Sequence, residues 1–136
     1  MLATKWAKDA YLAKVTLDTA MDNSLTRAEI SAMRRSYGEA GLETLPADPF
    51  AAFMTWLTEA RANPVIVEAN AMVLSTLGGD GEISTRTVLL KDVSEGGFTF
   101  FTNYSSRKAQ AMELNSQVTL LFPWYAMERQ VSISGL

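Results

Sequence analysis

Residues Ser105, Ser106, Arg107 and Lys108 place two hydroxyls and two cations directly before a predicted helix, Arg107–Leu114. A helix N-terminus offers unpaired backbone N–H groups and a positive dipole potential, both of which favour bound anions. Arginine adds a bidentate fork suited to phosphate, and lysine adds a point charge. The alternative is a serine N-cap followed by two solvated basic residues, although cations in a first turn oppose the helix dipole. The segment is a candidate phosphate site.

A second candidate is the run Arg86-Thr87-Val88-Leu89-Leu90-Lys91, which predicts a strand with a cation at each end. Strand alternation places Arg86, Val88 and Leu90 on one face and the other three residues on the opposite face. In a regular strand the two cations therefore cannot reach the same group, whereas a bulge would change this. One cation would hold a phosphate and the other a second ligand; the alternative is a barrel strand with charged ends.

The composition limits which ligands this chemistry could serve. The 136 residues are 48% hydrophobic and carry a net charge of −3, which indicates one globular domain without the basic excess typical of nucleic-acid binders. A small anionic ligand is therefore favoured over a nucleic acid. The chain has no Cys and no His, which excludes disulfides, Cys- or His-based zinc sites and a Ser-His-Asp triad. We expect no metal site.

The absence of cysteine fits the cytoplasm, and the N-terminus lacks the apolar run of a signal peptide. No apolar run approaches the roughly 20 residues that a membrane span needs. The sequence therefore predicts a cytoplasmic protein with no membrane contact.

Two other patterns have structural explanations. Gly78-Gly79-Asp80-Gly81 matches neither a dinucleotide fingerprint nor a P-loop, and it predicts a hairpin turn. Asp80 and Glu82 do not form a calcium loop. Phe122-Pro123-Trp124-Tyr125 predicts an aromatic cluster at a strand end rather than a stacking platform for bases.

The first half of the chain predicts three helices. An apolar stripe from Trp6 to Met21 predicts the first. The second helix begins at Thr26, which forms a capping box with Glu29, and Leu25 and Ile30 occupy the positions of a hydrophobic staple. This helix should end at Gly38. The third begins at N-cap Asp48, with Pro49 in its first turn, and ends at Asn63-Pro64.

After Pro64 the apolar period changes from helical spacing to two, which predicts strands. The fold class is therefore α+β, with N-terminal helices followed by an antiparallel meander that could close as a barrel. The last strand has no cap behind it, so its edge would need covering, and the sequence looks cut short or completed by something else. The predicted strands are Ala71–Leu77, Ile83–Val93, Phe98–Thr102, Val118–Phe122 and Arg129–Ser134.

Five motifs in order resemble the pyridoxine/pyridoxamine 5′-phosphate oxidase family, whose members are FMN enzymes with a split-barrel fold. The resemblance runs from about Met33 to Gly135. The motifs are Arg34-Arg35-Ser36-Tyr37, Leu45-Pro46-Ala47-Asp48-Pro49, Arg86 to Lys91, Phe101-Thr102-Asn103 with Ser106-Arg107-Lys108, and Leu121-Phe122-Pro123-Trp124 with Glu128-Arg129-Gln130-Val131.

The resemblance implies roles for individual residues. Arg86 should reach the FMN phosphate, and Lys91 should lie beside the flavin and contact the substrate's phosphate. Phe101 stands where the family commonly has tyrosine, so a hydroxyl contact is lost there. The implied cofactor-binding residues are Arg86, Thr87, Val88, Leu89, Leu90, Lys91, Phe101, Thr102, Arg107, Lys108 and Gln130. The implied substrate-binding residues are Arg34, Arg35, Ser36, Tyr37 and Lys91.

The resemblance also implies the activity, which is FMN-dependent oxidation of pyridoxamine or pyridoxine 5′-phosphate to pyridoxal 5′-phosphate with O2 as acceptor. Family members are homodimers with FMN at the interface. No catalytic side chain is expected, because the flavin supplies the redox chemistry. We expect residues 1–25 to form a variable N-terminal helix and residues 26–136 an FMN-binding split-barrel domain.

The family continues past the Arg-Gln-Val strand with more strands, helices, substrate-phosphate ligands, a late Trp and an Arg-x-His segment, so the resemblance implies a chain truncated at its C-terminus. Two alternatives therefore stay open. One is a non-catalytic FMN- or pyridoxal-phosphate-binding module, and the other is an inactive fragment.

Overall fold

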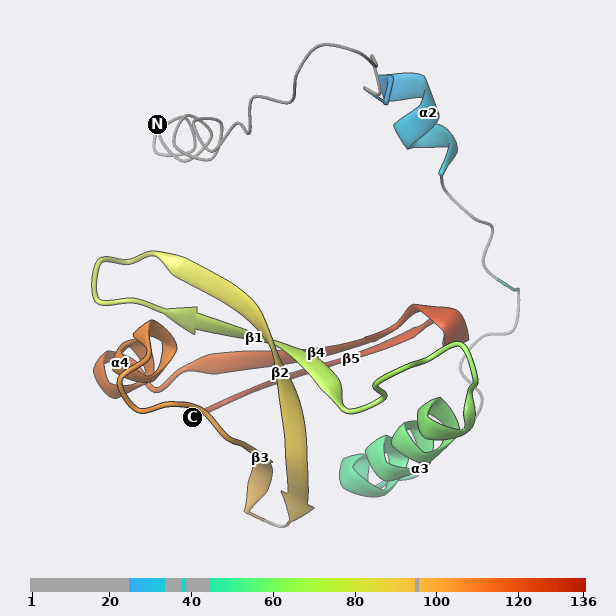
Figure 1. The fold of residues 1–136 in the computed structure, drawn as a ribbon. Coiled ribbons are helices and arrows are strands. Elements are labelled where there is room, and N and C mark those ends of the chain that lie inside the picture. The colour runs from blue at the N-terminus through green and yellow to red at the C-terminus, as the bar shows by residue number, and fades with distance from the viewer. Residues whose placement is uncertain (1–24, 34–37, 39–44, 95) are drawn as a thin grey trace. The chain divides into compact units, whose positions relative to one another are not determined.

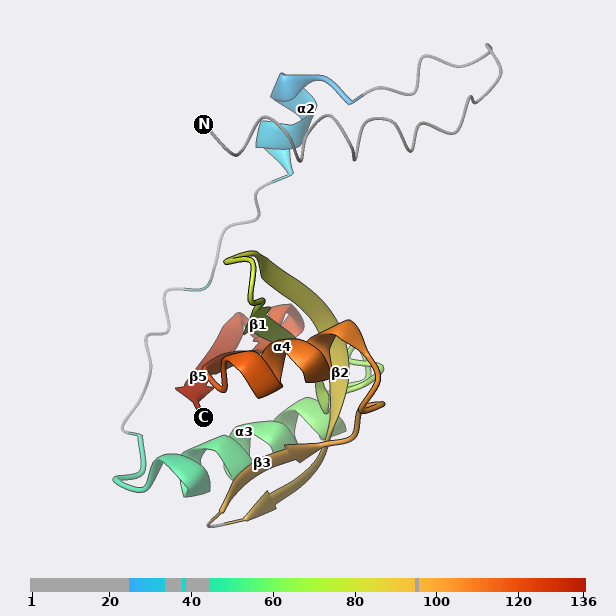
Figure 2. The same ribbon diagram turned by 90° about the vertical axis from the view of Figure 1, so that its left-hand side faces the viewer.

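The computed structural model describes residues 25–33, 38, 45–94 and 96–136. The chain divides into two compact units, Met1–Ser36 and Tyr37–Leu136. The described part of the first unit holds helix α2 (Arg27–Ala32), and every other described element belongs to the second unit. Figures 1 and 2 show these elements in two views. In the described ranges no helix is long and apolar enough to cross a membrane.

Helix α2 confirms the predicted capping box. The Thr26 hydroxyl accepts from the Glu29 N–H at 3.2 Å, and the Glu29 carboxylate accepts from the Thr26 N–H at 2.7 Å. The bond from the Thr26 N–H and a second one, which the Thr26 hydroxyl donates to the same carboxylate at 2.7 Å, lower the pKa of Glu29. The helix ends at Ala32, so its predicted extension to Gly38 is wrong, and the staple residues Leu25 and Ile30 are exposed. The predicted helix from Trp6 to Met21 lies outside the described residues.

Helix α3 (Pro49–Ala62) begins and ends where the sequence predicts. The Asp48 carboxylate accepts from the backbone N–H groups of Phe50 and Ala51, so two of the unpaired donors of the first turn are satisfied. Asn63 follows the last helical residue, and Pro64 comes next. The helix buries Phe53 and Ala60 against the sheet.

The second unit is built on one curled, antiparallel five-stranded sheet (Figure 1). The predicted α+β class is confirmed, but the strand order β3-β2-β1-β4-β5 is not that of a simple meander. Helix α4 (Arg107–Leu114) follows the edge strand β3, and the chain then places β4 beside β1. The strands are β1 (Ala71–Leu77), β2 (Ile83–Ser94), β3 (Gly97–Phe100), β4 (Val118–Trp124) and β5 (Arg129–Gly135).

Two strands end two residues away from their predicted ends. Strand β3 ends at Phe100, so Phe101 and Thr102 lie in the loop that leads to α4. Strand β4 continues through Pro123 to Trp124 instead of breaking at the proline. The ladder between β1 and β4 ends at Leu121, so Pro123 pairs with β5 alone and needs no N–H bond to β1.

The core lies between α3 and one face of the sheet. Phe122 is 0% exposed, and its ring centroid lies 4.9 Å from that of Phe53 and 5.5 Å from that of Trp124. The indole N–H of Trp124 donates to the backbone oxygen of Ala69 at 2.9 Å, so its polar atom is satisfied inside the core. The predicted aromatic cluster is confirmed for Phe122 and Trp124, whereas Tyr125 is exposed in the short 3-10 helix η1 (Tyr125–Met127).

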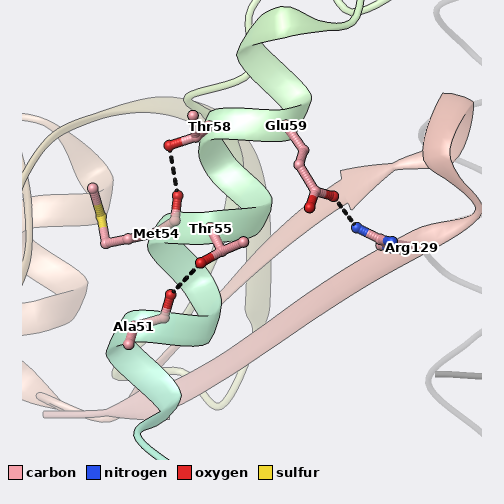
Figure 3. A network of polar contacts seen from close by, with 6 residues as sticks. All are labelled: Ala51, Met54, Thr55, Thr58, Glu59 and Arg129. Carbon is pink, nitrogen blue, oxygen red and sulfur yellow. Dashed lines mark hydrogen bonds and ion pairs between the residues drawn. The ribbon is translucent and has the colours of Figure 1, made fainter. Parts of the chain in front are cut away.

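A polar clamp joins α3 to strand β5. The Arg129 guanidinium donates to the Glu59 carboxylate, as Figure 3 shows, and it lies 4.9 Å from the centroid of the Trp56 ring. In the same view the Thr55 and Thr58 hydroxyls bond to backbone oxygens one turn earlier in α3. The clamp therefore ties the first residue of β5 to the helix that covers the core.

We expect the Glu59–Arg129 pair to contribute little to stability, because the side chains are 49% and 33% exposed. In a double-mutant cycle of Glu59→Gln and Arg129→Gln, the coupling free energy should be about 0.2–1 kcal/mol, and high salt should reduce it. Urea denaturation measures it. A cycle of Glu59→Gln with Arg61→Gln is the control, since residues two apart on a helix do not face each other. Equal coupling in both cycles would contradict the assignment.

Candidate functional site

Arg86 lies on β2, where that strand pairs with β1 and not with β3, and it points to the face of the sheet that carries the core. Its partner across the β1–β2 ladder is Leu74. Its Nη1 donates to the Thr76 hydroxyl at 2.8 Å and to the Leu74 backbone oxygen at 3.3 Å. In the described part of the chain these bonds use one of its three nitrogens, and a guanidinium has five N–H donors. Donors therefore remain for a ligand.

Arg86 and Arg107 form a pair of like charges. The pKa of Arg86 is lowered, first by burial and then by the positive charge of Arg107. Among the described residues the ion pair is that of Glu59 with Arg129, so neither Arg86 nor Arg107 forms an ion pair with a described carboxylate. Two neighbouring cations without a counter-charge favour a bound anion, because the anion relieves both the repulsion and the desolvation.

The N-terminus of α4 adds hydroxyls beside this pair. Ser106 is the N-cap, and its hydroxyl accepts from the Ala109 N–H at 3.3 Å. The Thr102 and Ser106 hydroxyl oxygens lie 3.3 Å apart, so the loop after β3 is tied to the start of the helix. Asn103 holds Ser105 through two hydrogen bonds to its side-chain oxygen. The predicted helix and its serine cap are confirmed, and Lys108 is half-buried in its first turn.

The remaining residues of β2 divide between its two faces as the alternation predicts. Val88 and Leu90 pack in the core. Thr87 is exposed, and Leu89 is half-buried on the opposite face. Lys91 is exposed and lies at a bulge, because β3 pairs with Leu90 and with Asp92 in successive positions. Five residues of strand separate Arg86 from Lys91 by roughly 16 Å.

Gln130 does not join the Arg86–Arg107 pair within one chain. It is exposed on β5 and pairs with Pro123, on the face opposite the core. Two strands lie between β2 and β5, which separates them by roughly 14 Å. Phe101 is 76% exposed in the loop after β3. Arg34, Arg35, Ser36 and Tyr37 lie outside the described residues.

A hollow of about 280 Å³ lies between the β1–β2 hairpin and α4, and Arg107 is one of its lining residues. Its other lining residues include Ser84 and the two acidic residues Asp80 and Glu82. Two carboxylates in one wall disfavour a phosphate there. The like-charged pair of Arg86 and Arg107 is therefore the better anion site.

Sequence reasoning missed Thr76. This threonine is 2% exposed, and its hydroxyl is the nearest hydrogen-bond partner of Arg86. The sequence did contain a signal. The inward-facing residues of β1 are Met72, Leu74 and Thr76, so a polar side chain ends an otherwise apolar series. Only the strand register places that hydroxyl two positions from the residue paired with Arg86.

Comparison with known proteins identifies the family. Residues 58–136 match the family described as pyridoxamine 5′-phosphate oxidase. Among curated proteins, the chain is 46% identical over 110 residues to pyridoxine/pyridoxamine 5′-phosphate oxidase of Shewanella sediminis, covering 79% of this chain and 52% of that protein. It is 48% identical over 111 residues to the protein of the same name from Streptomyces avermitilis, covering 78% of this chain and 50% of that protein. The chain spans about half the length of these relatives.

Solved structures agree on the fold. PhzG from Burkholderia lata 383, in complex with tetrahydrophenazine-1-carboxylic acid, superposes with a TM-score of 0.62 at 30% identity, covering 66% of this chain and 44% of that one. A pyridoxamine 5′-phosphate oxidase-related, FMN-binding protein from Nostoc punctiforme superposes with a TM-score of 0.56 at 18% identity, covering 67% of this chain and 47% of that one. The curled sheet is thus the incomplete split barrel that the resemblance implied. By its motifs, its fold and its matched residues, the chain belongs to the pyridoxamine 5′-phosphate oxidase family.

Proposed function

We propose that the protein binds FMN and, with it, oxidises pyridoxamine or pyridoxine 5′-phosphate to pyridoxal 5′-phosphate with O2 as the electron acceptor. The observation that carries the proposal is the pair Arg86 and Arg107 beside the N-terminus of α4, two neighbouring cations of which neither forms an ion pair with a described carboxylate. Curated relatives named as pyridoxine/pyridoxamine 5′-phosphate oxidases support the reaction.

The residues fit a flavin phosphate. Arg86 offers guanidinium donors from a position held by Thr76 and Leu74, and Arg107 adds a second positive charge. Charge-assisted bonds of this kind are short and strong, and the fork of arginine matches the oxygens of a phosphate. Lys108 lies in the first turn of α4, Ser106 is the N-cap, and the Thr102 hydroxyl of the preceding loop lies 3.3 Å from that of Ser106, so all three can complete the set.

The protein's part in the reaction is binding and orientation. Bound FMN would supply the redox chemistry, by accepting a hydride equivalent from C4′ of the substrate and passing the electrons to O2. Lys91, about 16 Å along β2 from Arg86, would bind the phosphate of the substrate while Arg86 holds that of the cofactor. The residues of β2, including Thr87, Val88, Leu89 and Leu90, and the loop residue Phe101 would line the flavin. This division keeps two phosphates apart on one strand.

A homodimer with FMN at the interface would bring Gln130 to the flavin. Within one chain Gln130 lies on the opposite face of the sheet from Arg86. A second subunit could supply the side chain that the first cannot. The proposal therefore includes a dimer, with Arg34, Arg35, Ser36 and Tyr37 contributing to the substrate site.

Reconstitution with FMN and an assay of pyridoxal 5′-phosphate test the function. The purified chain should retain flavin through gel filtration, elute as a dimer, and form pyridoxal 5′-phosphate and hydrogen peroxide in equal amounts from either substrate in air. Without FMN no product should form. Stable flavin binding with no turnover would contradict the oxidase and leave a flavin-binding module, which is the second candidate because the chain spans about half of its relatives.

A further inference from the structure

We infer that Thr76 is a positioning residue that sets the guanidinium of Arg86 for a phosphate-bearing ligand. The inference deepens the proposed function and rests on it, because the ligand is the phosphate of the proposed cofactor. Thr76 itself would not contact the ligand. Its effect would pass through one hydrogen bond to Arg86.

The geometry makes Thr76 the inner support of the arginine. The Thr76 side chain is 2% exposed at the end of the inward row of β1, and its Oγ1 accepts from Nη1 of Arg86 at 2.8 Å. The same Nη1 donates to the Leu74 backbone oxygen at 3.3 Å. These two hydrogen bonds fix the position of Nη1. Because the guanidinium is planar and rigid, they also fix the directions of its remaining N–H groups.

A hydroxyl suits this position better than an apolar group. Arg86 is partly desolvated and has Arg107 as a like-charged neighbour, so its inner N–H groups need an acceptor from the protein. Valine would fill the same volume but would remove the hydroxyl acceptor at 2.8 Å, so Nη1 would keep only the longer bond to the Leu74 backbone oxygen. The guanidinium would then gain by turning toward solvent, and the orientation for phosphate would be lost. The one buried polar side chain of the described core is thus explained by Arg86.

The test compares FMN with riboflavin, which has the same ring system and no phosphate. Dissociation constants are measured by quenching of flavin fluorescence in the full chain. Thr76→Val should weaken FMN binding about tenfold, the equivalent of one hydrogen bond to a charged group, and should leave riboflavin binding unchanged. Thr76→Ser retains the hydroxyl and should restore FMN binding to within about twofold of the native chain.

Ser75→Ala provides a matched control. The Ser75 hydroxyl lies on the opposite face of the same strand and bonds to the Thr85 hydroxyl at 3.2 Å. Loss of this hydroxyl should change the dissociation constant of neither FMN nor riboflavin. If the valine variant does not fold, Thr76→Ala replaces it with the same expectation.

The outcomes separate the inference from the function on which it rests. A Thr76→Val protein that binds FMN as tightly as the native chain would overturn the positioning role and leave the proposed function in place. An equal loss of FMN and riboflavin would overturn it too, because that pattern indicates general damage to the fold. A native chain that binds FMN no better than riboflavin would overturn both, since no phosphate site would then exist.

Discussion

Replacing Arg86 with alanine should weaken FMN binding by about ten- to a hundredfold, because hydrogen bonds to a charged group contribute roughly 1.5–3 kcal/mol. The guanidinium of Arg86 is held in place by hydrogen bonds to Thr76 and Leu74 of the neighbouring strand β1. Its loss would also leave Arg107 as the sole guanidinium of the pair. Titration of the flavin with the protein, followed by fluorescence, measures the change.

Riboflavin and a distant arginine are the controls for this prediction. Arg86→Ala should not alter riboflavin binding, since the missing contact is to phosphate. Arg61→Ala removes the same charge from the exposed last turn of α3 and should leave both ligands unaffected. Arg86→Lys keeps the charge but loses the fork, so its affinity should fall between those of alanine and the native residue. Unchanged retention of FMN by Arg86→Ala would refute the phosphate site.

Replacing Phe122 with alanine should lower the free energy of unfolding by about 3–5 kcal/mol. The side chain is 0% exposed and joins β4 to α3 through its contact with Phe53, and the Trp124 ring packs against both. Removing the ring leaves a cavity between helix and sheet and breaks three aromatic pairs, those with Phe53, Phe98 and Trp124. Because domains of this size are stable by only about 5–15 kcal/mol, the loss is a large share of the total.

Urea denaturation followed by tryptophan fluorescence checks this second prediction. Phe122→Leu should cost less than the alanine variant, because it refills most of the volume. Tyr125→Ala is the matched control, an aromatic residue three positions along the chain that is 75% exposed, and it should change stability by less than about 0.5 kcal/mol. Similar losses for Phe122→Ala and Tyr125→Ala would show that the core does not centre on Phe122.

Local chemistry explains which elements the sequence predicted well. Asp48 with Pro49 defines the start of α3, and Ser106 defines the start of α4, because capping depends on neighbours in the chain. Alternation in β1 and β2 was equally informative, since each strand has one face in the core. The failures follow the same logic. Strand β4 passes through Pro123 because β1 no longer pairs with it there, which is a property of the sheet and not of the proline.

The candidate site also depends partly on local sequence and partly on tertiary structure. By itself the sequence determined the candidate chemistry, since Arg86, Arg107 and Lys108 are recognisable from their neighbours as candidate phosphate ligands, and the resemblance of the motifs that contain them implies FMN. Only the tertiary structure decided which of them meet. Strand order and register bring Thr76 against Arg86, place Arg107 close enough to lower its pKa, and turn Gln130 to the opposite face. These relations join residues 10 to 44 positions apart, and no periodicity along the chain encodes such pairings.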